Sequence, residues 1–398
     1  MKIQIVNDRK TEKAFIGFPK RIYKNDPNYV APFDKDIKAA FDPKQNIHFN
    51  NGNAARWLLY DSNEKVIGRI AAFYEKNKAE ADYVRSGGCG FFECIDNQEA
   101  ANKLFDTAAE WLKKEGFEAI TGPINFGENE SNWGCLVYGF EPQGYGMAYN
   151  FPYYQKLFEN YGFQLYYRQF SFHIDLDKPF PERFWKIAEW INKRPNYSYE
   201  HFDYNQAKKF VNDTVKVYNE AWPLLKDDYT PMDPDSIYEL LEKAKPIMDP
   251  KLCWFAYHKG EPIAFFTFLP DANQIFRHLN GKLHLWNKIK FLILKKQKVM
   301  TRMRGNAAGV SPKFQNSGVE SGIMYQLKQV VEQYPHYKQV ELSWVGDFNP
   351  KMLSLYKNTG AYHAKTHITY RYMINKDIPF QRFMPERLDP EKLPEGVL

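Results

Sequence analysis

Residues 310–319 are of the types that can hold a phosphate group. Small residues suited to a strand lead through Pro312 and the polar Gln315, Ser317 and Gly318 into a helix with apolar periodicity. The first N–H groups of a helix have no partner within it, and the helix dipole favours negative charge there. Gly318 lets an anion approach these amides, because a side chain at this point would block it. The stretch predicts an anion-binding loop.

A tyrosine that can act as an acid follows further along the chain. Tyr356 lies within residues 349–361, a second helical segment. A phenol with a pKa near ~10 is protonated at neutral pH and can donate to a leaving group. The alternative is a tyrosine that only packs on an amphipathic helix. No general base is predicted, because four candidates are interpreted as ordinary polar surface residues: Glu341, Asp347, His363 and His367.

These two segments resemble motifs of the GNAT superfamily of acyl-CoA N-acyltransferases. The sequence VSPKFQNSGV at 310–319 is similar to the pyrophosphate loop of the family. The sequence NPKMLSLYKNTGA at 349–361 is similar to the family's helix beside the cofactor, and a strand-like segment at 339–344 separates the two. This chain departs from the pattern at Glu320, where the family has Gly or Ala. A carboxylate there could repel a pyrophosphate or point away from it.

The resemblance implies an acyl-CoA as donor, most simply acetyl-CoA, and a small-molecule or peptide amine as acceptor. A strand N–H near Val310 would face the thioester oxygen, Asn349 would bind the pantetheine arm, and Tyr356 would protonate the departing thiolate. Backbone amides of the loop would bind the pyrophosphate, and the strand before it would pair with pantetheine. The implied cofactor-binding residues are Ala308, Gly309, Val310, Gln315, Asn316, Ser317, Gly318, Val319, Glu320 and Asn349.

Other interpretations stay open. Ser317 and Glu320 have the spacing of a capping box, which would satisfy the helix N-terminus without any ligand. The chain could transfer an aminoacyl or long-chain acyl group, as enzymes of the Fem and N-myristoyltransferase types do. It could also bind CoA without catalysis or serve as a protein scaffold.

The chain repeats one structural plan. A hairpin pattern at 57–73 matches one at 254–268, and residues 152–162 match residues 350–360. Helical residues at 98–115 share apolar spacing with the helix after Gly318. The repeat predicts an α/β fold of two tandem GNAT-like domains, each a central mixed sheet flanked by helices. The predicted boundaries are 1–174, a linker with a short aromatic helix at 175–196, 197–376, and a tail at 377–398.

The two copies differ at the residues that matter for chemistry. The first copy has Glu99 where the second has Gly318, and Phe158 where the second has Tyr356. We therefore assign the chemistry to the second copy and treat the first as degenerate. Two insertions break the repeat. Residues 123–150 form a glycine-rich loop that either binds a ligand or elaborates the surface. Lysine-rich residues 278–299 could lie on an anionic membrane or cover a site, but we expect them to pack their apolar side on their own domain.

Composition limits the function classes. The chain has 398 residues, 44% of them hydrophobic, which predicts packed domains rather than disorder. A net charge of +6 is too modest and too dispersed to predict nucleic-acid binding. The four cysteines lack metal-binding spacing and predict reduced thiols in a cytoplasmic protein. No signal peptide and no apolar run long enough to cross a bilayer is visible, so membrane contact is not expected.

Overall fold

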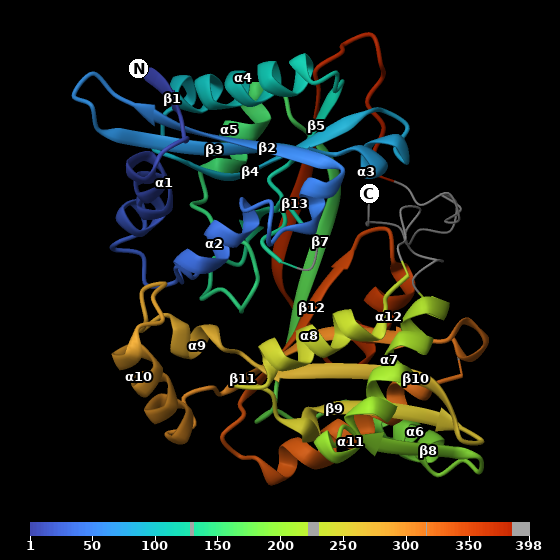
Figure 1. The fold of residues 1–398 in the computed structure, drawn as a ribbon. Coiled ribbons are helices and arrows are strands. Elements are labelled where there is room, and N and C mark those ends of the chain that lie inside the picture. The colour runs from blue at the N-terminus through green and yellow to red at the C-terminus, as the bar shows by residue number, and fades with distance from the viewer. Residues whose placement is uncertain (128–130, 222–230, 316, 384–398) are drawn as a thin grey trace.

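The computed structural model describes residues 1–127, 131–221, 231–315 and 317–383. Its strands form one mixed sheet that continues through the whole molecule (Figure 1). The strand order is β1-β2-β3-β4-β5-β13-β7-β12-β11-β10-β9-β8, and β6 pairs with β13.

The first half contains a long antiparallel hairpin and the helices that cover it. Asp8 begins the first helix, because its carboxylate accepts from the Thr11 N–H at 2.7 Å. The strands are β1 (Lys2–Ile5), β2 (Gly52–Tyr60), β3 (Val66–Glu75), β4 (Ser86–Cys94), β5 (Ala119–Gly122), β6 (Cys135–Tyr138) and β7 (Gln164–Asp175). The helices are α1 (Arg9–Ile22), α2 (Asp34–Ala40), α3 (Lys76–Glu80), α4 (Gln98–Lys114) and α5 (Tyr154–Tyr161).

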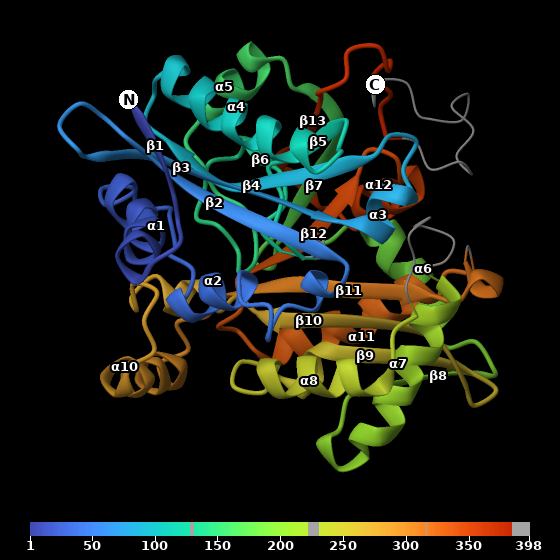
Figure 2. The same ribbon diagram turned by 45° about the horizontal axis from the view of Figure 1, so that its top comes forward.

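The second half follows the same plan after the helix of the predicted linker. Figure 2 shows α7 and α8 in front of its strands and α11 behind them. The strands are β8 (Tyr197–His201), β9 (Cys253–His258), β10 (Glu261–Pro270), β11 (Arg302–Val310), β12 (Gln339–Gly346) and β13 (Tyr362–Met373). The helices are α6 (Glu182–Asn192), α7 (Ala207–Ala221), α8 (Pro234–Ala244), α9 (Asn273–Phe276), α10 (Leu285–Lys296), α11 (Val319–Gln333) and α12 (Pro350–Asn358).

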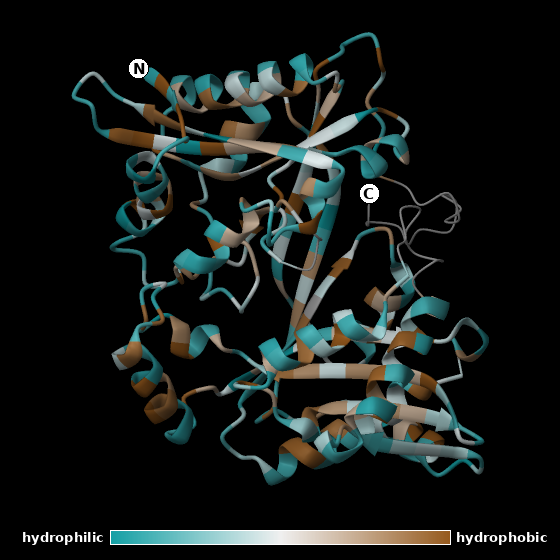
Figure 3. Cartoon of the chain, in the orientation of Figure 1, coloured by the Kyte–Doolittle hydropathy of each residue, from teal (hydrophilic) through white to brown (hydrophobic). Residues whose placement is uncertain are grey.

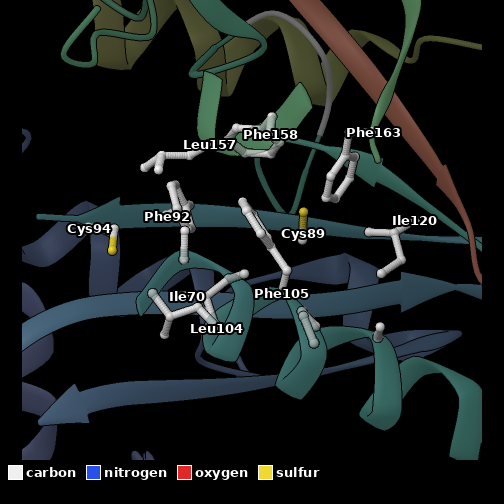
Figure 4. Packing of buried hydrophobic residues seen from close by; sticks show 14 of the residues in the cluster. Ile70, Cys89, Phe92, Cys94, Leu104, Phe105, Ile120, Leu157, Phe158 and Phe163 are labelled. Atoms are coloured by element: carbon white, nitrogen blue, oxygen red, sulfur yellow. The ribbon is translucent and has the colours of Figure 1, made fainter. Parts of the chain in front are cut away.

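The predicted repeat and fold class are confirmed. The order β2, β3, β4, α4, β5, α5, β7 in the first half recurs as β9, β10, β11, α11, β12, α12, β13 in the second. Each half has its own core on the face covered by its long helix. In the first half the rings of Phe92, Phe105 and Phe158 pack between α4, α5 and the sheet (Figure 4). In the second, Ile323 and Leu327 of α11 pack against the strands.

The last strands of the two halves are exchanged. β13 lies between β5 and β7, and β7 lies between β13 and β12. Each half therefore completes the sheet of the other, and the two strands run antiparallel through the centre (Figure 1). The predicted domain boundaries at 174, 196 and 376 stay a prediction. In space, residues 362–373 belong beside the first half.

The structure bears on both insertions. The described part of the glycine-rich loop packs inward, because Gln143 and Asn150 are buried and Tyr145 donates its N–H to Asp271 of the second half at 2.9 Å. The lysine-rich segment buries Leu279, but α10 within it has no buried residue and exposes several large apolar side chains. For α10 the expected packing is therefore wrong. No helix in the described ranges is both long enough and apolar enough to cross a membrane.

Candidate functional site

The parallel pairing of β11 with β12 is short. It ends at Arg304 and Glu341, and beyond this pair β11 continues to Val310 with β10 as its strand partner. β12 turns to β7 instead, and its register with β7 shifts between Leu342 and Val345. The two strands therefore separate and leave an opening between them.

A cleft of about 2530 Å³ runs between the two halves and enters this opening. Ligand pockets for drug-sized molecules are roughly 300–1,000 Å³, so this cleft has room for more than one extended substrate. Its lining is largely apolar. In the opening it includes Ala308 of β11, Leu342 and Trp344 of β12, and Asn349, Met352 and Tyr356 around α12.

The backbone N–H of Val310 points toward the opening. The next residue, Ser311, donates its N–H to the Ile263 carbonyl at 2.8 Å. This bond makes Val310 and Ala264 a non-hydrogen-bonded pair of the antiparallel ladder, in which both N–H groups point away from the partner strand. The Val310 N–H therefore lies on the side of β11 that β12 has left, where it can donate to a ligand.

Tyr356 lies on α12 and lines the cleft. Its ring meets the ring of Phe172 edge-on, with the centroids 5.6 Å apart. Burial raises the pKa of the Tyr356 phenol above its ordinary value of 10.0. The hydroxyl is therefore protonated throughout the neutral range, which is the state a general acid needs.

Asn349 begins α12 and also lines the cleft. Its side-chain oxygen accepts from the Met352 N–H at 3.2 Å, and its own N–H donates to the Gly346 carbonyl at 3.0 Å. The cap uses one lone pair of the side-chain oxygen, and the amide nitrogen is the group that can donate to a ligand. The residue positions the first turn of the helix that carries Tyr356.

Gly318, with φ at 84°, is the N-cap of α11, so the helix begins directly after the predicted loop, and Ser317 and Glu320 do not form the alternative capping box. Burial raises the pKa of the Glu320 carboxyl, and its own backbone N–H lowers it. A side chain at 318 would meet α6, because a Cβ there would lie 2.3 Å from Ile191 Cδ1. An ionised Glu320 carboxylate would repel an anion bound at these amides.

The structure brings some of the predicted residues together and separates others. Ala308, Asn349 and Tyr356 share the cleft, whereas Gly309 and Val310 are buried within β11. Asn316 lies outside the described residues. Five residues of the loop lie at the start of α11 and, within the described ranges, are not part of the cleft lining: Gln315, Ser317, Gly318, Val319 and Glu320.

A buried charge cluster lies where β7, β11, β12 and β13 meet. Glu341 is 0% exposed and accepts from Lys365 at 2.9 Å, with His173 Nε2 at 3.0 Å. Arg302 and Arg304 approach the same carboxylate at 3.6 and 3.5 Å. Burial alone would raise the pKa of Glu341, but the surrounding cations and the histidine hydrogen bond hold it well below its usual value. The carboxylate is ionised and fixes Arg304, which lines the cleft.

The expectation that four polar residues lie on the surface is wrong for three of them. Glu341, Asp347 and His367 are buried. The fourth, His363, is exposed and stacks on the ring of Tyr138 with the centroids 4.9 Å apart. A signal for the cluster was present, because Arg302 and Arg304 alternate on the strand that precedes the loop, and cations on one face of a central strand need a buried anion.

Comparisons with known proteins agree with this architecture. No protein-family model matches the chain. The tandem GNAT protein from the clavulanic acid biosynthesis pathway superposes with a TM-score of 0.55 at 11% identity, over 96% of this chain and 100% of that one. The chain has a tandem GNAT fold. A GCN5-related glucosamine N-acetyltransferase region of a fungal β-N-acetylglucosaminidase gives a TM-score of 0.54 at 12% identity, over 93% of this chain and 38% of that one.

Two curated proteins are similar along nearly their whole length. The "Bacterial ceramide synthase" of Caulobacter vibrioides is 28% identical over 368 residues, which cover 90% of this chain and 94% of the relative. Protein YghO of Escherichia coli is 22% identical over 373 residues, covering 91% of this chain and 93% of the relative. The opening between β11 and β12 thus lies in the second GNAT-like half, which is the half to which the sequence assigns the chemistry.

Proposed function

We propose that this protein is an N-acyltransferase that moves a long acyl chain from acyl-CoA to the amine of a long-chain amino alcohol. The observation that carries the proposal is the opening between β11 and β12. The Val310 N–H faces it, and Tyr356 with its raised pKa lines it. The Val310 N–H can thus donate to an oxyanion and the Tyr356 hydroxyl to a leaving group in the same opening, as acyl transfer requires.

The reaction needs few groups from the chain. The acceptor nitrogen forms a bond to the thioester carbon, and the carbon–sulfur bond breaks. The Val310 N–H donates to the thioester oxygen as negative charge develops on it. The Tyr356 hydroxyl gives its proton to the departing sulfur, and the proton lost by the amine leaves through the wet part of the cleft. The amide nitrogen of Asn349 binds the pantetheine arm.

The substrate class rests on the cleft and on the similarity to a ceramide synthase. Its volume of about 2530 Å³ and its largely apolar lining suit two long hydrocarbon chains. Ceramide formation joins a fatty acyl group to a long-chain amino alcohol, and the relative of that name matches 90% of this chain. Acetyl transfer to a small amine is the second candidate, which the fold neighbours with acetyltransferase names favour.

The experiment compares donors and acceptors on one preparation. Calorimetric titration with acetyl-CoA and with palmitoyl-CoA measures donor binding, and mass spectrometry measures amide formation with sphinganine and with a short amino alcohol. We expect palmitoyl-CoA to bind more tightly and its acyl group to appear on sphinganine. Preferential transfer of acetyl to the short amine would favour the second candidate. Failure to bind either donor would overturn the proposal and favour a scaffold.

A further inference from the structure

Helix α10 lies at the edge of the second half (Figure 1), and several of its apolar side chains are exposed to solvent. Trp286 is 75% exposed, Leu285 69% and Leu292 64%, and Ile289 and Ile293 are also exposed. Figure 3 shows this helix as one of the most hydrophobic segments that stand away from the body of the molecule. Soluble surfaces rarely gather so many large apolar side chains on one helix without a partner.

The helix has two distinct sides. Phe291 and Leu294 are half-buried, and Asn287 holds the helix to its own loop by donating to the Leu279 carbonyl at 2.9 Å. The other side carries the exposed apolar residues at helical spacing, with Leu285, Ile289 and Leu292 in one row. The inward side thus anchors α10, and the outward side faces solvent in the described part of the chain.

The charged side chains of this segment itself are all positive. Residues 278–299 contain six lysines and no acidic residue. Lys290 and Lys295 donate to the carbonyls of His278 and Pro246, which places them at the sides of the helix rather than over its apolar row. An apolar row flanked by lysines complements a surface with an apolar interior and anionic groups at its boundary with water.

We propose that α10 docks this protein, lying flat, on an anionic lipid bilayer. Its 12 residues are too few to cross the hydrocarbon layer of about 30 Å, so the helix lies in the interface. A second copy of the chain fits the surface less well, because a two-fold contact would bring the lysines of both copies together. Nucleic acid would match the lysines but would leave the tryptophan and leucines in water.

The cleft opens beside this surface. Leu283, Lys288, Phe291 and Leu292 belong to its lining, so α10 forms part of both the docking surface and the cleft wall. A lipid chain can therefore pass from the bilayer into the cleft along apolar side chains. This delivery role rests on the proposed function, whereas the docking itself does not: a protein that floats with vesicles yet transfers no acyl group would keep the docking and lose the enzyme.

The test uses the full-length protein and two kinds of vesicle, phosphatidylcholine alone and phosphatidylcholine mixed with phosphatidylglycerol. We expect flotation with the anionic vesicles, weakened by salt because exposed charges are screened. The double variant Leu285→Ser/Trp286→Ser should lower the vesicle partition coefficient by at least roughly tenfold, since both side chains leave the bilayer. The matched control is Ile187→Ser/Trp190→Ser, an exposed apolar pair on α6, which should float normally.

A charge variant separates the lysines from the apolar row. Lys282→Gln/Lys296→Gln/Lys298→Gln should lower binding to the anionic vesicles roughly tenfold or more, because each lysine contributes several-fold near such a surface. The control is Lys103→Gln/Lys113→Gln/Lys114→Gln on α4, three exposed lysines far from α10. Equal losses in both triple variants would overturn the proposal, because the net charge alone would then explain the binding.

A fluorescent label reports the depth of the helix directly. The four native cysteines are buried, so Trp286→Cys and Trp190→Cys each provide one accessible thiol for an environment-sensitive dye. We expect a blue shift on vesicle addition at position 286 and none at 190. No flotation with either vesicle, or a shift at both positions, would contradict the proposal. A change from dimer to monomer in Leu285→Ser/Trp286→Ser, with unchanged flotation, would show that a second copy occupies the surface instead.

Discussion

The two halves of the molecule open their sheets in the same way, but different groups fill the two openings. In the first half β4 and β5 pair in parallel from Ser86 and Ala119 to Gly88 and Thr121, a segment of the same length as the β11–β12 pairing. Counted from the start of this segment, Phe92 of β4 occupies the position of Ala308 in β11. The two halves thus share one backbone arrangement. Individual side chains determine what occupies the opening between the two parallel strands of each half.

The first half fills its gap with its own chain. The Ile124 N–H donates to the Cys89 carbonyl at 2.8 Å, and a Cβ on Gly90 would lie 1.7 Å from the Ile124 carbonyl oxygen. Phe92 packs against Phe105 with the ring centroids 4.7 Å apart. In the second half the end of β12 pairs with β7 instead, and the position of Phe92 is taken by the small side chain of Ala308.

The same contrast holds for the backbone donor. Cys94 is the counterpart of Val310, and its N–H donates to the Tyr154 hydroxyl at 3.0 Å. A phenol oxygen of the protein thus takes the place that the thioester oxygen would take in the second half. The counterpart of Tyr154 on α12 is Met352, whose side chain contains no oxygen that could accept this hydrogen bond. The difference teaches that a GNAT-like opening is lost by filling an acceptor position, without any change in the strands.

The largest effect that would test the comparison concerns Glu341, whose counterpart in the first half is the neutral Thr121. Replacing Glu341 by Ala should lower the free energy of unfolding by about 3–5 kcal/mol, because Lys365 and Arg304 would lose their buried counter-ion, whereas Arg302 keeps Asp271. Urea denaturation measures the change. The control Glu332→Gln removes an exposed carboxylate and should change stability by less than about 1 kcal/mol. A similar loss in both variants would contradict the buried cluster.

This cluster also sets a pH dependence. The folded-state pKa of Glu341 lies well below its usual 4.5, so its contribution to stability is present above pH 4.5 and is lost as the pH falls through the folded-state pKa. Glu341→Gln should therefore flatten the acid side of the stability profile measured by urea denaturation. An unchanged acid slope in the variant would mean that other carboxylates produce it.

The next effect would convert one half toward the other. Ala308→Phe introduces the ring that Phe92 provides in the first half, and it should lower kcat/KM for acyl transfer by roughly a hundredfold, equivalent to about 2.7 kcal/mol. Ala308→Ser is the matched control and should keep most activity. Steady-state kinetics with a melting curve of each variant separates blocking from misfolding. Full activity in the phenylalanine variant would place the acyl-CoA elsewhere.

A smaller effect concerns the phenol itself. Tyr356→Phe should lower kcat by roughly tenfold and leave CoA binding nearly unchanged, because only the proton to the leaving sulfur is lost. The mirror variant Phe158→Tyr places a hydroxyl in the fully buried core of the first half. It should lower the free energy of unfolding by about 1–3 kcal/mol and leave kcat unchanged. Unaltered turnover in Tyr356→Phe would remove the acid role.

The smallest effect tests the loop before α11. If its amides bind pyrophosphate, the Glu320 carboxylate competes with the ligand, and Glu320→Gln should strengthen CoA binding roughly fivefold. Burial raises the pKa of Glu320, so binding to the unmodified protein should weaken as the pH rises and the carboxyl ionises, while the variant loses this dependence. Calorimetry across pH measures both. Equal affinities at every pH would place the pyrophosphate away from α11.

The sequence predicts the elements that depend on local residue patterns, but it does not predict the features that depend on long-range strand pairing. The hairpins and α4 follow from apolar periodicity and α12 from the resemblance to a family motif, and they are confirmed. Residues 163–174 and 361–373 are recognisable as strands, but two copies of one plan offer each of them two equivalent places. The exchange follows from long-range pairing, which periodicity does not encode.

The candidate site shows the same division. A motif can draw attention to Tyr356 and Asn349, because their residue types suit the chemistry. The burial of Glu341 depends on His173, 168 residues away, and on Lys365, and the exchanged strands bring both to it. The direction of the Val310 N–H is a matter of ladder register, which no residue type reveals.

The exchanged strands also impose an order on folding during synthesis. β5 ends at Gly122, but its strand partner β13 begins only at Tyr362. During synthesis the first half therefore leaves the ribosome with the edge of β5 bare, and this half closes only after the second has been translated. Cleavage of the backbone within residues 176–181 would give two fragments that stay associated. Each fragment would still contain the last strand that completes the sheet of the other.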